Sequence, residues 1–148
     1  MFTFRLEPLI TIRDNALKAR QKELANALNV RRTLEESFKN IERQLEEGIT
    51  AVRNLMQTGQ TVDVNFMLGF RQQEMFLRFE QDKLKQQISD VDKKIVLLRA
   101  DVVQANKELK IVEKLKEKQY EKYLKAEEKA ETNFLDEIAG RDKSTAAF

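Results

Sequence analysis

Cysteine and histidine are both absent from this chain of 148 residues. Their absence excludes disulfides, thiol or imidazole catalysis and the usual zinc ligands. Carboxylate-only magnesium or calcium sites stay possible, but no loop of the DxDxDG type occurs. Paired carboxylates such as Glu35 and Glu36 occur by chance on any charged helix surface and do not by themselves indicate a catalytic pair. We therefore expect no metal, no cofactor and no enzymatic activity.

Proline and glycine are scarce, with one Pro and four Gly, whereas 35% of the residues are charged. Such a chain has too few turn-forming residues for a domain of many elements, and its composition is typical of a long exposed helix or coiled coil. No uncharged apolar run approaches the ~20 residues that a membrane span needs. The first residues, MFTFRLEP, also lack the apolar core of a signal peptide. We expect a soluble, cytoplasmic protein.

A concentration of charge of one sign is missing as well. The 27 basic and 25 acidic residues are finely mixed and leave a net charge of +2. Proteins that bind nucleic acid usually concentrate positive charge on one face or arm. The mixed pattern favours a solvated helix surface and no nucleic-acid partner.

What the sequence does contain is a long heptad pattern in its second half. Two apolar series alternate at spacings of three and four, which is the pattern of a coiled coil. They consist of Leu77, Leu84, Val91, Leu98, Ala105 and Val112, and of Ile88, Ile95, Val102 and Leu109. So narrow an apolar stripe needs a partner helix of similar length.

The first half supplies that partner. Its series run from Ile10 to Val52 and from Arg13 to Leu55, with Arg31 and Gly48 as exceptions in the better-formed part. Arg31 sits where a polar residue fixes register at some cost in stability. We interpret it as a side chain whose stem lies along the seam while its guanidinium reaches water.

These patterns predict an all-α fold: a long two-helix antiparallel coiled-coil hairpin. We expect a single domain over residues 1–148, with helix 1 at about 5–56, opening around Pro8, and a tip at about 57–62 that contains Gly59. Helix 2 is expected at about 63–139, overhanging helix 1, with Gly140 as its stop and residues 140–148 as a flexible tail. The lead of Phe2 and Phe4 either folds back on the hairpin or extends helix 1; the pattern leaves both open.

Aromatic residues gather near the predicted tip, in the segment VNFMLGFRQQEMFLRF. Helical phasing puts Phe70 and Leu77 in the seam, with Phe66 and Met67 close to it. It puts four apolar side chains outside the seam: Leu68, Met75, Phe76 and Phe79. Either helix 1 wraps more widely and buries some of these rings, or they form an exposed patch that docks a partner protein. We favour the exposed patch.

Basic residues gather where the two termini are expected to meet. Helix 1 contributes Arg13, Lys18, Arg20 and Lys22, and the helix 2 overhang is rich in lysine and tyrosine. From the residues alone, ordinary solubilising charge explains this cluster better than a binding site does.

Both ends of the chain resemble the flagellar FliJ family. The opening FxFxLExLIxxR corresponds to Phe2, Phe4, Leu6, Glu7, Leu9, Ile10 and Arg13. The closing segments VEKLKEKQYEKY and ETNFLDEIAGR, which include Asp136, Glu137 and Ala139, are also similar to that family. Hairpin length and tip position fit the resemblance along the whole chain.

The resemblance implies a soluble stalk and adaptor of the flagellar type III export apparatus, with a role in motility and chemotaxis. Its implied partners are the ring-forming export ATPase, the membrane export gate and export chaperones, at the cytoplasmic face of the inner membrane. Carried over by region, the ATPase contacts are Arg13, Lys18, Arg20, Lys114, Lys118 and Lys122. The gate contacts are Leu68, Met75, Phe76 and Phe79.

Two other functions compete with this one. The first is a helical-hairpin export chaperone that holds unfolded clients with its apolar tip. The second is the equivalent stalk of a virulence-type secretion system.

Overall fold

The computed structural model describes residues 1–59 and 61–146, which form two helices, α1 (Glu7–Gln57, 51 residues) and α2 (Val64–Ala146, 83 residues). The two long helices pack against each other, and no strand occurs among the described residues. The predicted all-α helical hairpin is confirmed.

Helix α1 begins one residue before Pro8. The Leu6 carbonyl accepts hydrogen bonds from the N–H groups of Leu9 (2.9 Å) and Ile10 (3.3 Å). Pro8 fits in this first turn because the turn needs no N–H from it. Glu7 places a negative charge at the positive end of the helix dipole.

The lead before α1 folds back on α2 and does not extend the helix. Residues 1–4 have no regular secondary structure, and the Phe4 side chain is buried. The Glu7 N–H donates to the Phe4 carbonyl (3.2 Å), which turns the chain into the helix. Phe2 reaches Tyr120 of α2, with 5.2 Å between ring centroids. Of the two alternatives, the structure selects the folded-back lead.

The tip lies within one residue of its predicted bounds. Gly59 has φ of +71°, a left-handed conformation that favours glycine. The Thr58 hydroxyl donates to the Leu55 carbonyl (3.0 Å) at the end of α1. Asp63 caps α2, since its carboxylate accepts a hydrogen bond from the Asn65 N–H (3.2 Å).

The structure corrects the predicted end of the second helix. We expected Gly140 to stop it after Ala139, with a flexible tail over residues 140–148, but α2 continues to Ala146. A glycine stop needs a left-handed backbone, and among the described residues only Gly59 has a positive φ. A glycine inside a helix costs only about 1 kcal/mol, which the surrounding helix formers offset. Residues 147 and 148 lie outside the described part of the chain.

The chain packs as two compact units, each with a segment of both helices. The tip unit is Arg20–Asp101, and the terminal unit is Met1–Ala19 with α2 from Val102 onward. The prediction of a single domain stays a prediction.

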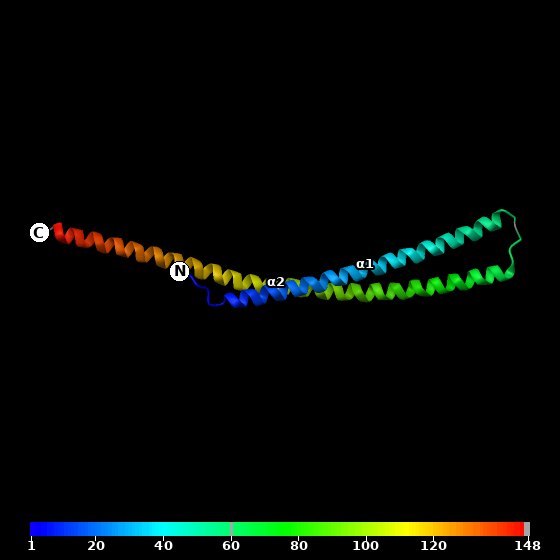
Figure 1. Cartoon of the computed structure of the whole chain (residues 1–148), viewed down its shortest axis with the longest axis horizontal. Helices are drawn as coiled ribbons and strands as arrows, with labels where there is room; N and C mark the ends of the chain where they lie inside the picture. Colours follow the sequence, from blue (N-terminus) through cyan, green and yellow to red (C-terminus); the bar gives the residue numbers. More distant parts are fainter. Residues whose placement is uncertain (60, 147–148) are drawn as a thin grey trace. The chain divides into compact units, whose positions relative to one another are not determined.

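In the tip unit the seam is closed by small and branched apolar side chains. Ala27, Ile95 and Leu98 form its buried cluster, with Leu24 and Val91 packed against them. Nearer the tip, the Phe70 ring lies over Gly48, where an added Cβ would come within 3.0 Å of it. Rising numbers in α1 thus match falling numbers in α2, so the helices are antiparallel, and Figure 1 shows them side by side in cyan and green.

In the terminal unit the buried side chains are Phe4, Ala105, Leu109 and Val112. Two ion pairs connect the helices here, Arg13–Glu108 (2.8 Å) and Glu7–Lys116 (2.7 Å). From one pair to the next, the residue numbers rise in α1 and fall in α2, so the helices are antiparallel in this unit too. Beyond Tyr123, every side chain from Leu124 to Asp142 is exposed, and this segment is the predicted overhang.

The heptad phase is confirmed along both helices. Every predicted seam position of α2 from Leu77 to Val112 is buried or half-buried. The same holds for α1 from Ile10 to Leu55, except for the exposed Arg20. The predicted seam is therefore the interface between the helices within each unit.

Candidate functional site

Four large apolar side chains on α2 of the tip unit face away from the seam. They form the tip patch, and their exposed fractions are Leu68 57%, Met75 70%, Phe76 62% and Phe79 67%. The seam neighbours Phe70 and Leu77 are half-buried. Helix α1 therefore does not wrap around to cover these rings, and the patch is exposed as predicted from the phasing.

The tip patch extends further toward the start of α2 than the sequence suggested. Phe66, placed close to the seam by phasing, is 51% exposed, whereas Met67 is half-buried. Val64 is exposed as well. An apolar surface of this kind on a charged helix is typical of a binding surface.

Of the six basic residues predicted to bind a partner, Arg13 has a structural role in the terminal unit. Its guanidinium donates to Glu108 (2.8 Å), and the other oxygen of Glu108 accepts from the Gln104 amide (3.3 Å). The Nε of Arg13 is buried and has no partner. Arg13 therefore joins the two helices, and its charge is already compensated.

Lys18 and Arg20 pair with their own helix. Lys18 contacts Asp14 (3.0 Å) in the terminal unit, and Arg20 contacts Glu23 (3.4 Å) in the tip unit. Both are exposed pairs at helical spacing, which contribute little to stability. Their charges are partly compensated before any partner arrives.

The remaining three residues form the lysine row, Lys114, Lys118 and Lys122, on α2 of the terminal unit. Their spacing of four places them in one row along the helix, and all three are exposed. Within the part of the chain that the structure describes, no ion pair engages any of them. These three lysines are available for an acidic partner surface.

A cluster of three aromatic rings lies on the other side of α2 from the lysine row, and the sequence pattern did not reveal it. The Phe2 ring centroid lies 5.2 Å from that of Tyr120 and 5.5 Å from that of Tyr123. The hydroxyl of Tyr123 donates to Glu127 (3.2 Å). Desolvation, together with the Glu127 carboxylate, raises the pKa of Tyr123. The available signal was the spacing of three between the tyrosines, which places both on one side of α2.

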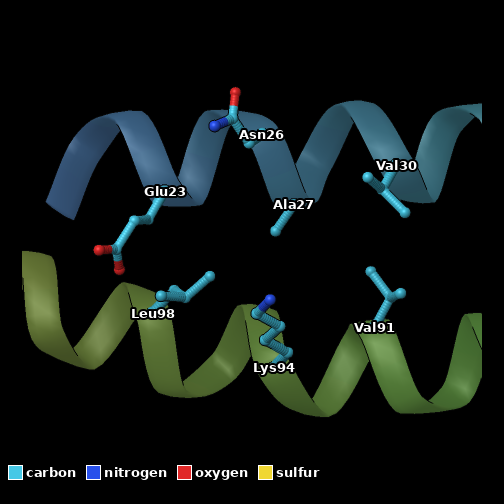
Figure 2. A pocket seen from close by; sticks show the side chains of 7 residues that line it. All are labelled: Glu23, Asn26, Ala27, Val30, Val91, Lys94 and Leu98. Carbon is cyan, nitrogen blue, oxygen red and sulfur yellow. The ribbon is translucent and has the colours of Figure 1, made fainter. Parts of the chain in front are cut away.

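A hollow of about 250 Å³ opens between the helices of the tip unit at Ala27 (Figure 2). The apolar part of its lining consists of Ala27, Val30, Val91 and Leu98. The charged or amide groups in the lining are those of Glu23, Asn26 and Lys94. The short side chain of Ala27 leaves this space opposite Leu98. The polar groups do not converge on a common point, as the polar groups of a ligand site do.

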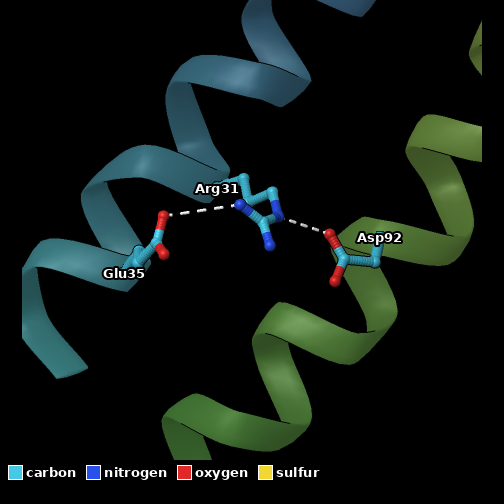
Figure 3. A network of polar contacts seen from close by, with 3 residues as sticks. All are labelled: Arg31, Glu35 and Asp92. Carbon is cyan, nitrogen blue, oxygen red and sulfur yellow. Dashed lines mark hydrogen bonds and ion pairs between the residues drawn. The ribbon is translucent and has the colours of Figure 1, made fainter.

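A polar contact crosses the seam of the tip unit at Arg31 (Figure 3). Its guanidinium donates to Asp92 on α2 and, at 3.4 Å, to Glu35 on its own helix. The hydrogen bond to Asp92 and the charge of Asp92 raise the pKa of Arg31. From the sequence we expected the guanidinium to reach water. It is partly exposed but also bridges the two helices, which supports a role in register.

The contacts between α1 and α2 in each unit are those of a helical hairpin. A comparison with protein families shows which family this chain belongs to. The sequence model of the family described as flagellar FliJ protein matches residues 1–146. The chain belongs to the FliJ family. This FliJ-family chain is therefore a component of flagellar protein export.

No curated protein and no solved structure matches this FliJ-family chain significantly. None of its helices is long and apolar enough to cross a bilayer, over residues 1–59 and 61–146. In the same residues, no three acidic side chains gather closely enough to hold a metal ion.

Proposed function

We propose that this chain is a non-enzymatic stalk and adaptor of the flagellar export apparatus. It engages the ring of the export ATPase, in the way that the central stalk of a rotary ATPase engages its ring. It also contacts the export gate and the export chaperones at the cytoplasmic face of the inner membrane.

The observation that carries this proposal is the part of α2 that α1 does not cover. From Leu124 to Asp142 this helix belongs to the terminal unit, yet every side chain in this segment is exposed. A single exposed helix gains little stability of its own, because most helical stability in proteins comes from packing. A helix of this kind fits a role inside a partner ring.

The two predicted surfaces take different parts in the proposal. The lysine row contributes an electrostatic contact to the ATPase, whereas Arg13 holds the two helices together through Glu108. The tip patch contributes an apolar contact to the gate, since exposed aromatic rings that become buried often dominate the energy of an interface.

The test is a binding measurement with the purified cognate export ATPase, followed by its hydrolysis rate with and without this chain. Lys118→Glu with Lys122→Glu is expected to weaken binding about tenfold and to reduce stimulation, because two attractive charges become repulsive. Lys83→Glu with Lys85→Glu, two exposed lysines of the tip unit, is the matched control. Binding that is equal for both variants would contradict a role of the lysine row.

The exposed tip patch also supports a second candidate function, a chaperone that holds unfolded clients. A chaperone of this kind suppresses aggregation of an unfolded flagellar substrate in the absence of any ATPase. Suppression that depends on Phe76 and Phe79, without any effect on the ATPase, would favour this function over the stalk.

A further inference from the structure

The lead before α1, the dark blue segment ahead of that helix in Figure 1, continues along α2 beyond the point where α1 begins. Helix α1 begins at Glu7, which pairs with Lys116 of α2 (2.7 Å). The Phe2 ring reaches Tyr123, about two helical turns further along α2, with 5.5 Å between ring centroids. An extended chain rises ~3.3 Å per residue, more than twice the ~1.5 Å of a helix, so these few residues span that distance.

The lead is held by two side chains of alternating residues. Phe4 is 6% exposed and Phe2 is half-buried, whereas Thr3 between them is exposed. This alternation is that of an extended segment with one side turned inward. The fit is loose, because an open hollow of about 300 Å³ remains between the lead and the Glu7–Lys116 pair.

The backbone of the lead contributes little to its attachment. In the described part of the chain, residues 1–3 take part in no hydrogen bond or ion pair. The turn into α1 has one backbone bond to the lead, from the Glu7 N–H to the Phe4 carbonyl (3.2 Å). The two helices, by contrast, have their backbone bonds within themselves. The contacts of the lead can therefore break while both helices and their seam stay intact, as segments with few buried contacts open locally.

We propose that the lead is a strap that opens and closes on α2 while the hairpin stays folded. Closed, it places Phe2 on Tyr120 and Tyr123 and keeps Phe4 buried. Open, it releases both phenylalanines and uncovers about two further turns of α2. The strap thus sets where the uncovered part of α2 begins, and it does so without a partner, so the inference is independent of the proposed function.

Opening is measured by the reactivity of one introduced thiol, since the chain has no cysteine of its own. Phe4→Cys in the lead and Leu109→Cys in the seam replace side chains of nearly equal burial, 6% and 7% exposed, in the same unit. The Phe4→Cys thiol is expected to react with a thiol reagent at least about 100-fold faster than that of Leu109→Cys, because only the latter requires the helices to separate. It should still react at least about tenfold more slowly than in the unfolded chain, because the strap is mostly closed.

Denaturant distinguishes the two kinds of opening. Low concentrations of urea should accelerate the Leu109→Cys thiol far more than the Phe4→Cys thiol, because separation of the helices exposes more surface. Equal rates with equal urea dependence would show that the lead opens only with the hairpin. A Phe4→Cys rate equal to that of the unfolded chain would show that the lead is never closed. A rate that falls as the protein concentration rises would show that the lead docks on a second copy. Each of these three results would overturn the inference.

A second measurement keeps Phe4 in place. In Tyr120→Phe, Tyr123 is the single tyrosine, and desolvation is the first cause of its raised pKa. Adding Phe2→Ala should lower the pKa of Tyr123 toward its ordinary value, because the ring that covers the phenol is gone. Thr3→Ala, at the exposed neighbour in the lead, is the matched control and should leave this pKa unchanged. The same pKa in both variants would mean that Phe2 does not close on Tyr123, and the strap would be refuted.

Discussion

At the scale of single residues, burial in this protein follows heptad position closely. Leu98 is 7% exposed and packs with Ala27 and Ile95, whereas its neighbour Leu97 is 67% exposed. Two adjacent leucines thus have opposite environments because one lies in the seam and the other outside it. The pair therefore provides a direct test of the seam.

Leu98→Ala is expected to lower the free energy of unfolding by about 2–5 kcal/mol, the cost of removing buried methylene and methyl groups. Leu97→Ala should change it by no more than about 0.5 kcal/mol, as exposed substitutions usually do. Thermal and urea unfolding followed by circular dichroism measures both. Similar losses for the two variants would mean that the seam is not where the structure places it.

Tyr123 provides a prediction on pH. Its pKa is raised by desolvation and by Glu127, so the folded chain favours the neutral phenol. The resulting stability is complete below the ordinary tyrosine pKa of about 10, and it is lost as the pH rises through the folded pKa. In Tyr120→Phe, which leaves Tyr123 as the single tyrosine, absorbance of the phenolate should titrate above that ordinary value. The same titration in denaturant is the control and should return to about 10.

At the scale of the helices, glycine acts in three different ways. Gly59 turns the chain at the tip with φ of +71°, and Gly48 makes room for the Phe70 ring. Gly140 lies inside α2, where an added Cβ would meet no other atom within 4 Å. Only the first two positions need glycine. Gly140 weakens the end of α2 without an evident packing reason.

Gly140→Ala is therefore expected to stabilise the end of α2 by about 1 kcal/mol, the difference in helix propensity. Gly59→Ala should destabilise the hairpin by about 1–2 kcal/mol, because a left-handed backbone is strained for alanine. Helicity by circular dichroism and amide hydrogen exchange at the end of α2 measure the first effect, and thermal unfolding measures the second. A gain at Gly59 or a loss of helicity at Gly140 would contradict these assignments.

At the scale of the whole molecule, the candidate binding surfaces belong to different packing units. The tip patch lies in the tip unit, and the lysine row lies in the terminal unit. Substitutions in one unit should therefore leave the other unit's contacts in place, since sites that share no partner residues usually act additively.

Phe76→Ala with Phe79→Ala should leave the thermal unfolding of the hairpin nearly unchanged, because both rings are exposed. The same variant should lose most of its affinity for the purified export gate protein, with ATPase binding retained. Loss of both partners at once would show that the two surfaces do not act independently. A strong drop in unfolding temperature would show that the rings are packed after all.

The sequence by itself determined the two helices, the phase of their seam and the exposure of the tip patch. These depend on the heptad spacing of residues such as Leu77 and Leu98, and a helix converts spacing into direction without knowledge of the rest of the chain. Because the second seam contains no charge and Gly59 allows a short turn at the tip, the antiparallel hairpin followed too.

The tertiary structure alone decided which residues meet across the seam and where the last helix ends. Phe2 on Tyr120, Arg13 on Glu108 and Arg31 on Asp92 each join residues far apart in the chain. A shift of the register by one helical turn would give these side chains other partners while leaving the heptads intact. Local pattern cannot set these contacts, so it could not show that Arg13 pairs with Glu108 on the other helix.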